Sequence, residues 1–163
     1  MNSAKGGIWL KQTGIKQIAE NRKARHDYFI LESYEAGIEL VGTEVKSIRN
    51  GNVNLKDSWC SIEEGQLFLR DMHVSPYEKG NVFNRDSRRT RRLLMHKREI
   101  LKLFGTLKTQ GLTLIPLSLY FKDGRVKVQI GLCKGKKLYD KREDAAIRSA
   151  NRDIDRAVKS RNQ

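Results

Sequence analysis

Apolar side chains alternate with polar ones most regularly between residues 112 and 132. The alternating apolar positions fall in two runs, Ile115, Leu117, Leu119 and Phe121, then Val126, Val128, Ile130 and Leu132. A period of two is typical of a half-buried strand, and Asp123-Gly124 between the runs is typical of a tight hairpin turn. Burial of the second run sends Lys127 and Gln129 to the opposite face. The pattern therefore predicts a hairpin that presents Lys127 from a rigid surface.

Two further pairs of short strands are predicted nearer the start of the chain. Aromatic and branched residues over 28–34 are typical of a strand, and we interpret 35–37 as a turn into a second strand over 38–41. Residues 57–62 and 66–71 have the same character and are joined by a polar tripeptide. Each pair is expected to form a hairpin.

Two segments change to a helical period. Over 42–49, Val45 and Ile48 share one side of a short helix, which leaves Lys46 and Arg49 together on another side. From His96 onward, an apolar stripe indicates a longer amphipathic helix that should cap the sheet. The stripe consists of Ile100, Leu101, Leu103, Phe104 and Leu107.

These elements amount to about six antiparallel strands with one long and one short helix, without the alternation of strand and helix that parallel sheets require. The sequence therefore predicts a mainly β domain with flanking helices, whose antiparallel strands form a closed or nearly closed barrel. A sandwich is the competing architecture. We expect a flexible leader over 1–20, this body over 21–134 and a basic tail over 135–163.

The tail changes abruptly in composition. Residues 134–163 contain ten lysines and arginines, five acidic residues and four large aliphatic side chains. Arg148, Arg152 and Arg156 repeat every four residues, so a helix over this segment would carry a basic stripe. So few apolar anchors cannot hold a helix firmly on the body. We therefore expect a tail that is disordered alone and helical only on a polyanion.

The charge of the whole chain indicates the nature of its partner. Among 163 residues, 33 are lysine or arginine and 19 are acidic, which gives a net charge of +14. Such an excess on separate elements, including an arginine-rich loop that ends at Arg92, indicates a polyanion. Because the sequence contains neither a recognition helix nor a zinc finger, folded RNA fits better than duplex DNA. A solvated basic surface without a dedicated partner remains the alternative.

The segment before the first predicted strand combines cations, an imidazole and an aromatic ring. Its candidate RNA contacts are Asn21, Lys23, Arg25, His26 and Tyr28. Cations can bind the RNA backbone and a ring can stack on an unpaired base. The alternative is a solvated entry to the strand with Tyr28 in the core. Glu35 repels phosphate, and the residues alone favour a role for it in the turn.

Several function classes find no support in the sequence. Cys60 and Cys133 are isolated and are expected to be buried small hydrophobes in a reducing compartment. The three histidines lack metal-ligand spacing, and no glycine-rich phosphate loop or nucleophile elbow is present. No apolar run reaches the length of a membrane span. We expect a soluble cytoplasmic monomer, without metal or cofactor, that is not an enzyme.

Four segments and the charged tail together resemble the small protein B (SmpB) family, the tmRNA-binding (SsrA-binding) proteins of bacterial ribosome rescue. The segments are NRKARHDYFI at 21–30, EAGIELVGTEVKSIRNG at 35–51, RRLLMHKREILKLFG at 91–105 and LSLYFKDGRVKVQIGLCKGKKLYDKR at 117–142. They occur in the family's order and cover most of the chain. The resemblance implies an oligonucleotide-binding-type barrel, which agrees with the antiparallel strands inferred above.

The resemblance also implies a function. Proteins of this family bind the tRNA-like domain of tmRNA, support its aminoacylation and deliver it with elongation factor Tu to stalled ribosomes in trans-translation. The family's RNA-contacting glutamate, leucine and lysine correspond to Glu35, Leu94 and Lys127, which overrules the turn interpretation of Glu35. Both the strand alternation and the family resemblance therefore indicate Lys127. The alternative function is a ribosome-associated structural protein that coats rRNA by charge.

The resemblance gives the tail a separate role on the ribosome. The family's tail motif corresponds to Gly135, Lys136, Lys137, Tyr139, Asp140, Lys141 and Arg142. It implies that this motif enters the decoding centre of the small subunit and continues as a helix along the empty mRNA channel. Some relatives have histidine where this chain has Tyr139. The tyrosine ring can still stack on a base, but it cannot take the role of a protonated imidazole.

Overall fold

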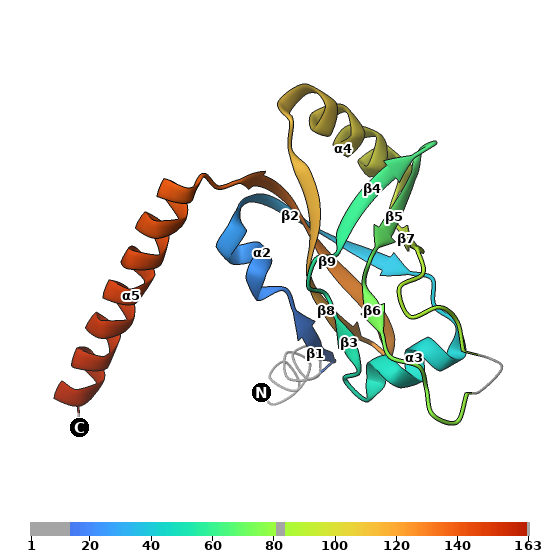
Figure 1. Cartoon of the computed structure of the whole chain (residues 1–163), viewed down its shortest axis with the longest axis horizontal. Helices are drawn as coiled ribbons and strands as arrows, with labels where there is room; N and C mark the ends of the chain where they lie inside the picture. Colours follow the sequence, from blue (N-terminus) through green and yellow to red (C-terminus); the bar gives the residue numbers. More distant parts are fainter. Residues whose placement is uncertain (1–13, 81–83, 163) are drawn as a thin grey trace, which may run out of the picture.

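One antiparallel sheet that closes on itself forms the centre of the fold (Figure 1). The computed structural model describes residues 14–80 and 84–162. The strands of the main sheet are β1 (Ile15–Glu20), β2 (Tyr28–Ile38), β4 (Trp59–Glu63), β5 (Gln66–Arg70), β7 (Arg91–Leu94), β8 (Thr113–Lys122) and β9 (Arg125–Gly135). β3 (Val53–Asn54) and β6 (His73–Val74) pair separately. Within the described residues the helices are α2 (Arg22–Asp27), α3 (Gly42–Arg49), α4 (Lys97–Gln110) and α5 (Leu138–Arg161).

The strand order shows how the sheet closes. Neighbours follow the order β1-β8-β4-β5-β7-β2-β9, and an additional pairing of β8 with β9 completes a ring. Of the seven strands, six form this ring, and β1 pairs with β8 beside it. All of these pairings are antiparallel. The expected mainly β architecture of about six antiparallel strands with flanking helices is confirmed.

The two hairpins predicted from alternation and turn residues are also present. Asp123 and Gly124 between β8 and β9 have φ angles of 51° and 75°, and Glu64 and Gly65 between β4 and β5 have 51° and 74°. Two consecutive positive φ values define the turn whose twist matches that of paired strands. The turn residues therefore fix both hairpins and their register.

The core fills the inside of the ring. Leu69, Val128 and Ile130 are fully buried there, and α4 adds Ile100 and Leu103 at one end. A smaller cluster under α2 contains Ala24, Ile115, Leu117 and Cys133. Cys60 and Cys133 are free and buried, as expected, and burial raises the pKa of the Cys133 thiol to about 11. Both thiols are therefore unreactive at neutral pH.

The hairpin expected over 28–41 is wrong, because β2 runs without a turn from Tyr28 to Ile38. Its partner β9 pairs with it from Tyr28 opposite Gly135 to Gly37 opposite Lys127. Gly37 serves close packing instead of chain reversal, since a Cβ there would lie 3.3 Å from Cβ of Leu94. An isolated glycine in a strand often marks such an approach. Glu35 therefore lies within a strand.

Three other boundaries differ from the expectations. Residues Ile15–Glu20 form β1 against β8, so the leader predicted over 1–20 is too long; 1–13 lie outside the described residues. Arg22–Asp27 forms α2, which sequence patterning missed because Ala24 is its one buried residue. Residues Arg91–Leu94 form β7 where an arginine-rich loop was expected.

Arg91 lies in the part of the expected loop that forms β7, and its contacts correct the phosphate-binding interpretation for Arg89 and Arg91. Its side chain is 0% exposed, and its Nε donates to Glu44 Oε2 at 2.6 Å. Its other nitrogens donate to backbone carbonyls, including Met72 O at 2.8 Å. Arg89 donates to Glu44 Oε1 at 2.5 Å. These two arginines therefore stabilise the fold.

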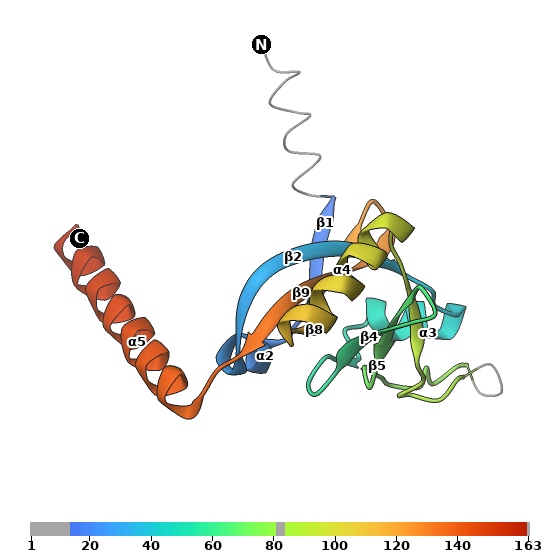
Figure 2. The same cartoon turned by 90° about the horizontal axis from the view of Figure 1, so that it is seen from above.

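Helix α5 projects away from the barrel (Figures 1 and 2). It begins at Leu138, within the basic tail expected over 135–163. Its large apolar side chains Ile147, Ile154 and Val158 are 53%, 60% and 52% exposed. Almost no apolar burial therefore supports this helix beyond its first turns. The expectation that it is disordered alone stays a prediction.

Candidate nucleic-acid interface

A row of residues crosses four strands on the outer face of the ring. Leu94 on β7 lies opposite Gly37 on β2, Gly37 lies opposite Lys127 on β9, and Lys127 lies opposite Tyr120 on β8. Side chains paired in this way share one face of a sheet. Because Gly37 has no side chain, Leu94 packs directly over it, with its Cβ 3.3 Å from where a Cβ of residue 37 would lie. The fold thus brings together residues 33 positions apart in the sequence.

Glu35 is on the same face and is held by two neighbours. The Tyr120 hydroxyl donates to its Oε2 at 2.5 Å, and Lys122 Nζ lies 3.3 Å from its Oε1. The hydrogen bond from Tyr120 and the charges of Lys122 and Lys127 lower the pKa of Glu35 against partial burial. Burial and the nearby Glu35 carboxylate raise the pKa of Tyr120. Glu35 is therefore anionic at neutral pH, and Tyr120 stays a hydrogen-bond donor.

A hollow of about 340 Å³ lies beside this row. Its lining includes Leu94, Val45, Val126, Lys127 and Arg125. Leu94 is 44% exposed and contributes apolar surface to this hollow. An apolar floor with cationic neighbours suits a ligand that combines a flat apolar ring with phosphate charge. The apolar stripe predicted for α4 does not line this hollow.

Helix α3 carries the predicted pair Lys46 and Arg49. Ile48 is fully buried and faces the core, so the helix is fixed against the barrel. The Arg49 guanidinium lies 5.8 Å from the Phe121 ring centroid, and Lys46 Nζ lies 5.3 Å from that of Tyr77. Such contacts orient a cation without neutralising its charge. Lys46 and Arg49 are both exposed, as the helical pattern predicts.

The candidates from 21–28 form a separate group around α2. Asn21 is buried: its Oδ1 accepts from the Ala24 backbone at 3.1 Å and its Nδ2 donates to Pro116 O at 3.0 Å. It caps α2 and ties it to β8, which is a structural role. Lys23 pairs with Asp57 at 2.9 Å. Arg25 lies 3.2 Å from Glu20.

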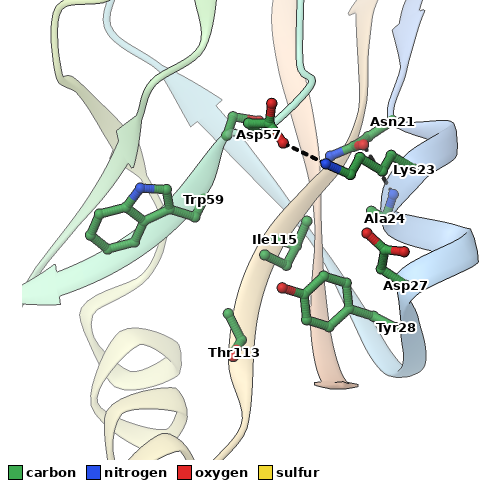
Figure 3. A pocket seen from close by; sticks show the side chains of 10 residues that line it. Asn21, Lys23, Ala24, Asp27, Tyr28, Asp57, Trp59, Thr113 and Ile115 are labelled. Atoms are coloured by element: carbon green, nitrogen blue, oxygen red, sulfur yellow. Dashed lines mark hydrogen bonds and ion pairs between the residues drawn. The ribbon is translucent and has the colours of Figure 1, made fainter. Parts of the chain in front are cut away.

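A second hollow of about 400 Å³ lies between α2 and the start of β4 (Figure 3). Tyr28 and Ile115 line one side, and Trp59 lines the opposite side. Trp59 is 41% exposed and its Nε1 donates to Asp71 at 3.1 Å. Sequence reasoning missed Trp59 because a tryptophan at the start of a strand usually signals the core. The Arg70 guanidinium lies 5.6 Å from the Trp59 ring centroid, and the exposed part of the ring can stack on a base.

The base of the tail is attached to this α2 region. The Lys136 side chain is 3% exposed, contacts the Asp144 carboxylate and lies 4.9 Å from the Phe29 ring centroid. Lys141 Nζ lies 3.3 Å from Asp27, which also accepts from His26 at 3.0 Å. The hydrogen bond from His26, followed by that from Lys141, lowers the pKa of Asp27 against partial burial. These contacts fix the direction in which α5 leaves the barrel.

The remaining tail candidates have simpler positions. Gly135 pairs with Tyr28 as the last residue of β9. Lys137 and Arg142 are exposed. Tyr139 and Asp140 belong to α5, and their side chains lie outside the described part of the chain.

The predicted RNA-binding residues therefore fall into two groups at opposite ends of β2. Gly37 marks the end with Glu35, Leu94, Lys127 and α3, and Tyr28 marks the end with α2 and the tail. The path along β2 between them is about 30 Å at ~3.3 Å per residue. We name the first group the barrel face and the second the tail base. Two partners, or two parts of one large partner, can be contacted at once.

Within residues 14–80 and 84–162, no cluster of three or more His, Cys, Asp or Glu side chains could hold a metal ion. The helices of the same residues include none with the length and apolarity to cross a membrane. The fold and its cationic surfaces define a basic, oligonucleotide-binding-type barrel protein.

Comparisons with known proteins identify the family. The model of the SmpB protein family matches residues 18–160, so the chain belongs to the SmpB family. It is 64% identical to the SsrA-binding protein of Clostridium tetani, over 94% of this chain and 99% of that protein. Identity to the SsrA-binding protein of Clostridium botulinum (strain Hall) is 60%, over 94% and 98%.

A solved structure is also similar. It is described as "tmRNA-SmpB: a journey to the center of the bacterial ribosome" and superposes with a TM-score of 0.65 at 50% identity. The match covers 78% of this chain and 94% of the other. The resemblance inferred from the sequence segments is thus confirmed.

Proposed function

We propose that this protein is the tmRNA-binding adaptor of trans-translation, which rescues stalled ribosomes. Membership of the SmpB family and the names of its relatives support this function. The observation that carries it is the row across β7, β2, β9 and β8, which brings Leu94 and Lys127 together on the face that holds Glu35. These are the three positions for which the family resemblance implies contact with RNA.

The barrel face can bind the tRNA-like domain of tmRNA by three different contacts. Lys127 supplies a charge for a phosphate, and the exposed Leu94 side chain packs against a base or ribose. Glu35 accepts a hydrogen bond from an exocyclic amine or a 2′-hydroxyl, which a phosphate cannot supply. Because the carboxylate repels misplaced phosphates, it adds specificity more than affinity.

The tail acts on the ribosome in this proposal. Residues Gly135, Lys136, Lys137, Tyr139, Asp140, Lys141 and Arg142 bind in the decoding centre, and α5 follows the empty mRNA channel. The basic stripe of α5 is exposed, and the pairs of Arg148 with Asp144 and of Arg156 with Asp153, at 3.2 and 3.8 Å, are surface pairs that rRNA phosphates can replace. A bound mRNA would occupy the same space. The tail thereby distinguishes an empty channel from a filled one.

The other partners follow from this role. Elongation factor Tu delivers the tmRNA complex, and the protein works as a cytoplasmic monomer that supports aminoacylation without catalysing a reaction itself. Incubation of the pure protein with labelled RNA and magnesium should leave the RNA intact. Cleavage would contradict the adaptor role.

Replacing Lys127 by alanine should lower affinity for the tRNA-like domain by about tenfold or more, the effect of losing a hydrogen bond to a charged group. Glu35→Gln should lower it less and widen the range of RNAs bound. Gel-shift titration measures both effects. Lys102→Ala on the exposed face of α4 is the matched control, because it removes the same charge from a residue that belongs neither to the row nor to the lining of the hollow beside it. Unchanged affinity in both variants, with the fold intact by circular dichroism, would show that the barrel face is wrongly assigned.

A further inference from the structure

A third hollow, of about 570 Å³, lies on the side of α3 away from the row of Leu94 and Lys127. It is formed between the start of α3 and the loop that follows β6. The residues of this hollow that matter here are Thr43, Lys46, Tyr77, Lys79, Gly80 and Arg85. Arg85 belongs to the arginine-rich loop noted in the sequence, whereas Lys79 was not a candidate. We call this site the α3 hollow.

The Asn84 side chain joins the described parts of this loop on either side of residues 81–83. The Asn84 amide accepts from the Tyr77 backbone N–H at 3.0 Å and donates to the Tyr77 carbonyl at 2.9 Å. The Gly80 N–H also donates to the Tyr77 carbonyl, at 2.8 Å. These bonds fix the two ends of the loop next to each other. Lys79 and Arg85 therefore start from fixed backbone positions.

Gly80 presses this loop against α3. A Cβ at this position would lie 2.6 Å from Asn84 Oδ1 and 2.9 Å from Thr43 Cγ2, so no side chain fits there without a shift. Gly80 is buried in this contact. The α3 hollow is consequently formed by tight packing and exists before any ligand binds.

The charges that line the α3 hollow are all positive. Lys46, Lys79 and Arg85 line it, and none of its described lining residues is acidic. Across 14–80 and 84–162, no ion pair engages Lys79 or Arg85, whereas Lys23, Arg25, Lys122 and Lys136 all have carboxylate partners. The nearest acid on α3, Glu44, is 5% exposed and already bound by two arginines. The α3 hollow thus combines three cations in a described lining that contains no acidic residue, an arrangement that favours a phosphate.

The position of α3 connects this hollow with the barrel face. Val45 lines the hollow next to Leu94 and Lys127, whereas Lys46, the next residue, lines the α3 hollow. An RNA strand that leaves Lys127 can therefore cross α3 past Arg49 and reach Lys79. We infer that the α3 hollow binds a backbone phosphate of RNA and extends the interface beyond the residues the family comparison indicates. This inference rests on the proposed function.

The test measures how affinity depends on salt. The double variant Lys79→Ala/Arg85→Ala should bind the tRNA-like domain about tenfold more weakly than the wild type at low salt. The slope of log affinity against log salt concentration should fall by about 1 for each lost phosphate contact. Arg98→Ala/Lys102→Ala on α4 removes the same two charges and should leave the slope unchanged. Gly80→Ala, which wedges the loop away from α3 without changing charge, should weaken binding in the same direction.

Two binding measurements distinguish tmRNA from rRNA as the source of the phosphate. If the double variant changes the slope with the isolated tRNA-like domain, the phosphate belongs to tmRNA. If it changes only the affinity of the preformed complex for ribosomes with an empty A site, the phosphate belongs to rRNA. No change in either measurement, with Lys127→Ala still weakening binding, overturns the α3 hollow but leaves the proposed function standing. A wild-type protein that does not bind the tRNA-like domain contradicts the proposed function itself.

Discussion

A chain truncated after Lys137 should still bind the tRNA-like domain of tmRNA with nearly the affinity of the full-length protein, because the barrel face lies at the other end of β2. The same variant should fail to support peptide tagging on stalled ribosomes. The barrel closes without the tail, since Gly135 is the last residue of β9. Keeping Lys136 preserves its contacts with the Arg25 carbonyl and the Phe29 ring, so α2 stays in place. Filter binding and an in vitro tagging assay give the two readouts.

Point variants separate the charge of the tail from its length. Reversing the stripe with Arg148→Glu, Arg152→Glu and Arg156→Glu should abolish tagging, whereas replacing the same three residues by lysine should largely preserve it. Both triple variants leave the barrel face untouched. If truncation weakens tmRNA binding as much as tagging, the division of work between barrel and tail is incorrect.

The largest effect on stability is expected from Glu44→Gln. Removing one partner of a buried charge pair costs about 3–5 kcal/mol, because the remaining charge is left without compensation. Here the Arg91 guanidinium, 0% exposed, would lose its carboxylate. Glu39→Gln is the matched control, since Glu39 and Arg92 are 3.8 Å apart and exposed, and such pairs contribute about 0–1 kcal/mol. Urea unfolding followed by circular dichroism measures both free energies, and equal losses would contradict the assignment of a buried pair.

The same carboxylate makes stability depend on pH. Burial alone would raise the pKa of Glu44, but hydrogen bonds from Arg89 and the Val41 backbone and the charge of Arg91 outweigh it, so the pKa is lowered from 4.5. A lowered pKa in the folded state adds stability that is present above the unfolded-state value and is lost as pH falls through the folded-state value. Wild-type stability should therefore fall below pH 4.5, and Glu44→Gln should lose less over that interval. An identical fall in both proteins would contradict this origin.

The sequence revealed those parts of the fold in which local signals agree with the final packing. The hairpin of β8 and β9 combines strict alternation with a turn that suits positive φ angles, and α3 and α4 have clear helical periods. The course of β2 was misread because Gly37 was taken as a turn residue. Gly37 instead leaves room for Leu94, which lies on a strand 57 residues further along the chain. Contacts of that range leave no local signature.

In the site as well, local patterns predict some features, whereas contacts between distant parts of the chain determine the others. The exposure of Lys127 follows from alternation, and that of Lys46 and Arg49 follows from helical spacing. The link between Tyr120 and Glu35 could not be predicted, because it requires the register of strands that are not consecutive. Arg91 looked like a surface cation, and only its pairing with Glu44 allows it to be buried. Charge counting therefore overestimates the arginines that are available to RNA.

Competition binding tests the central claim most directly. A labelled tRNA-like domain of tmRNA is bound at physiological salt and challenged with unlabelled rRNA fragments of equal length. Specific recognition by the barrel face predicts that these fragments displace the label only at a large excess, whereas the unlabelled domain displaces it at stoichiometric concentration. Displacement by both competitors at the same concentration would mean that the protein coats RNA by charge alone.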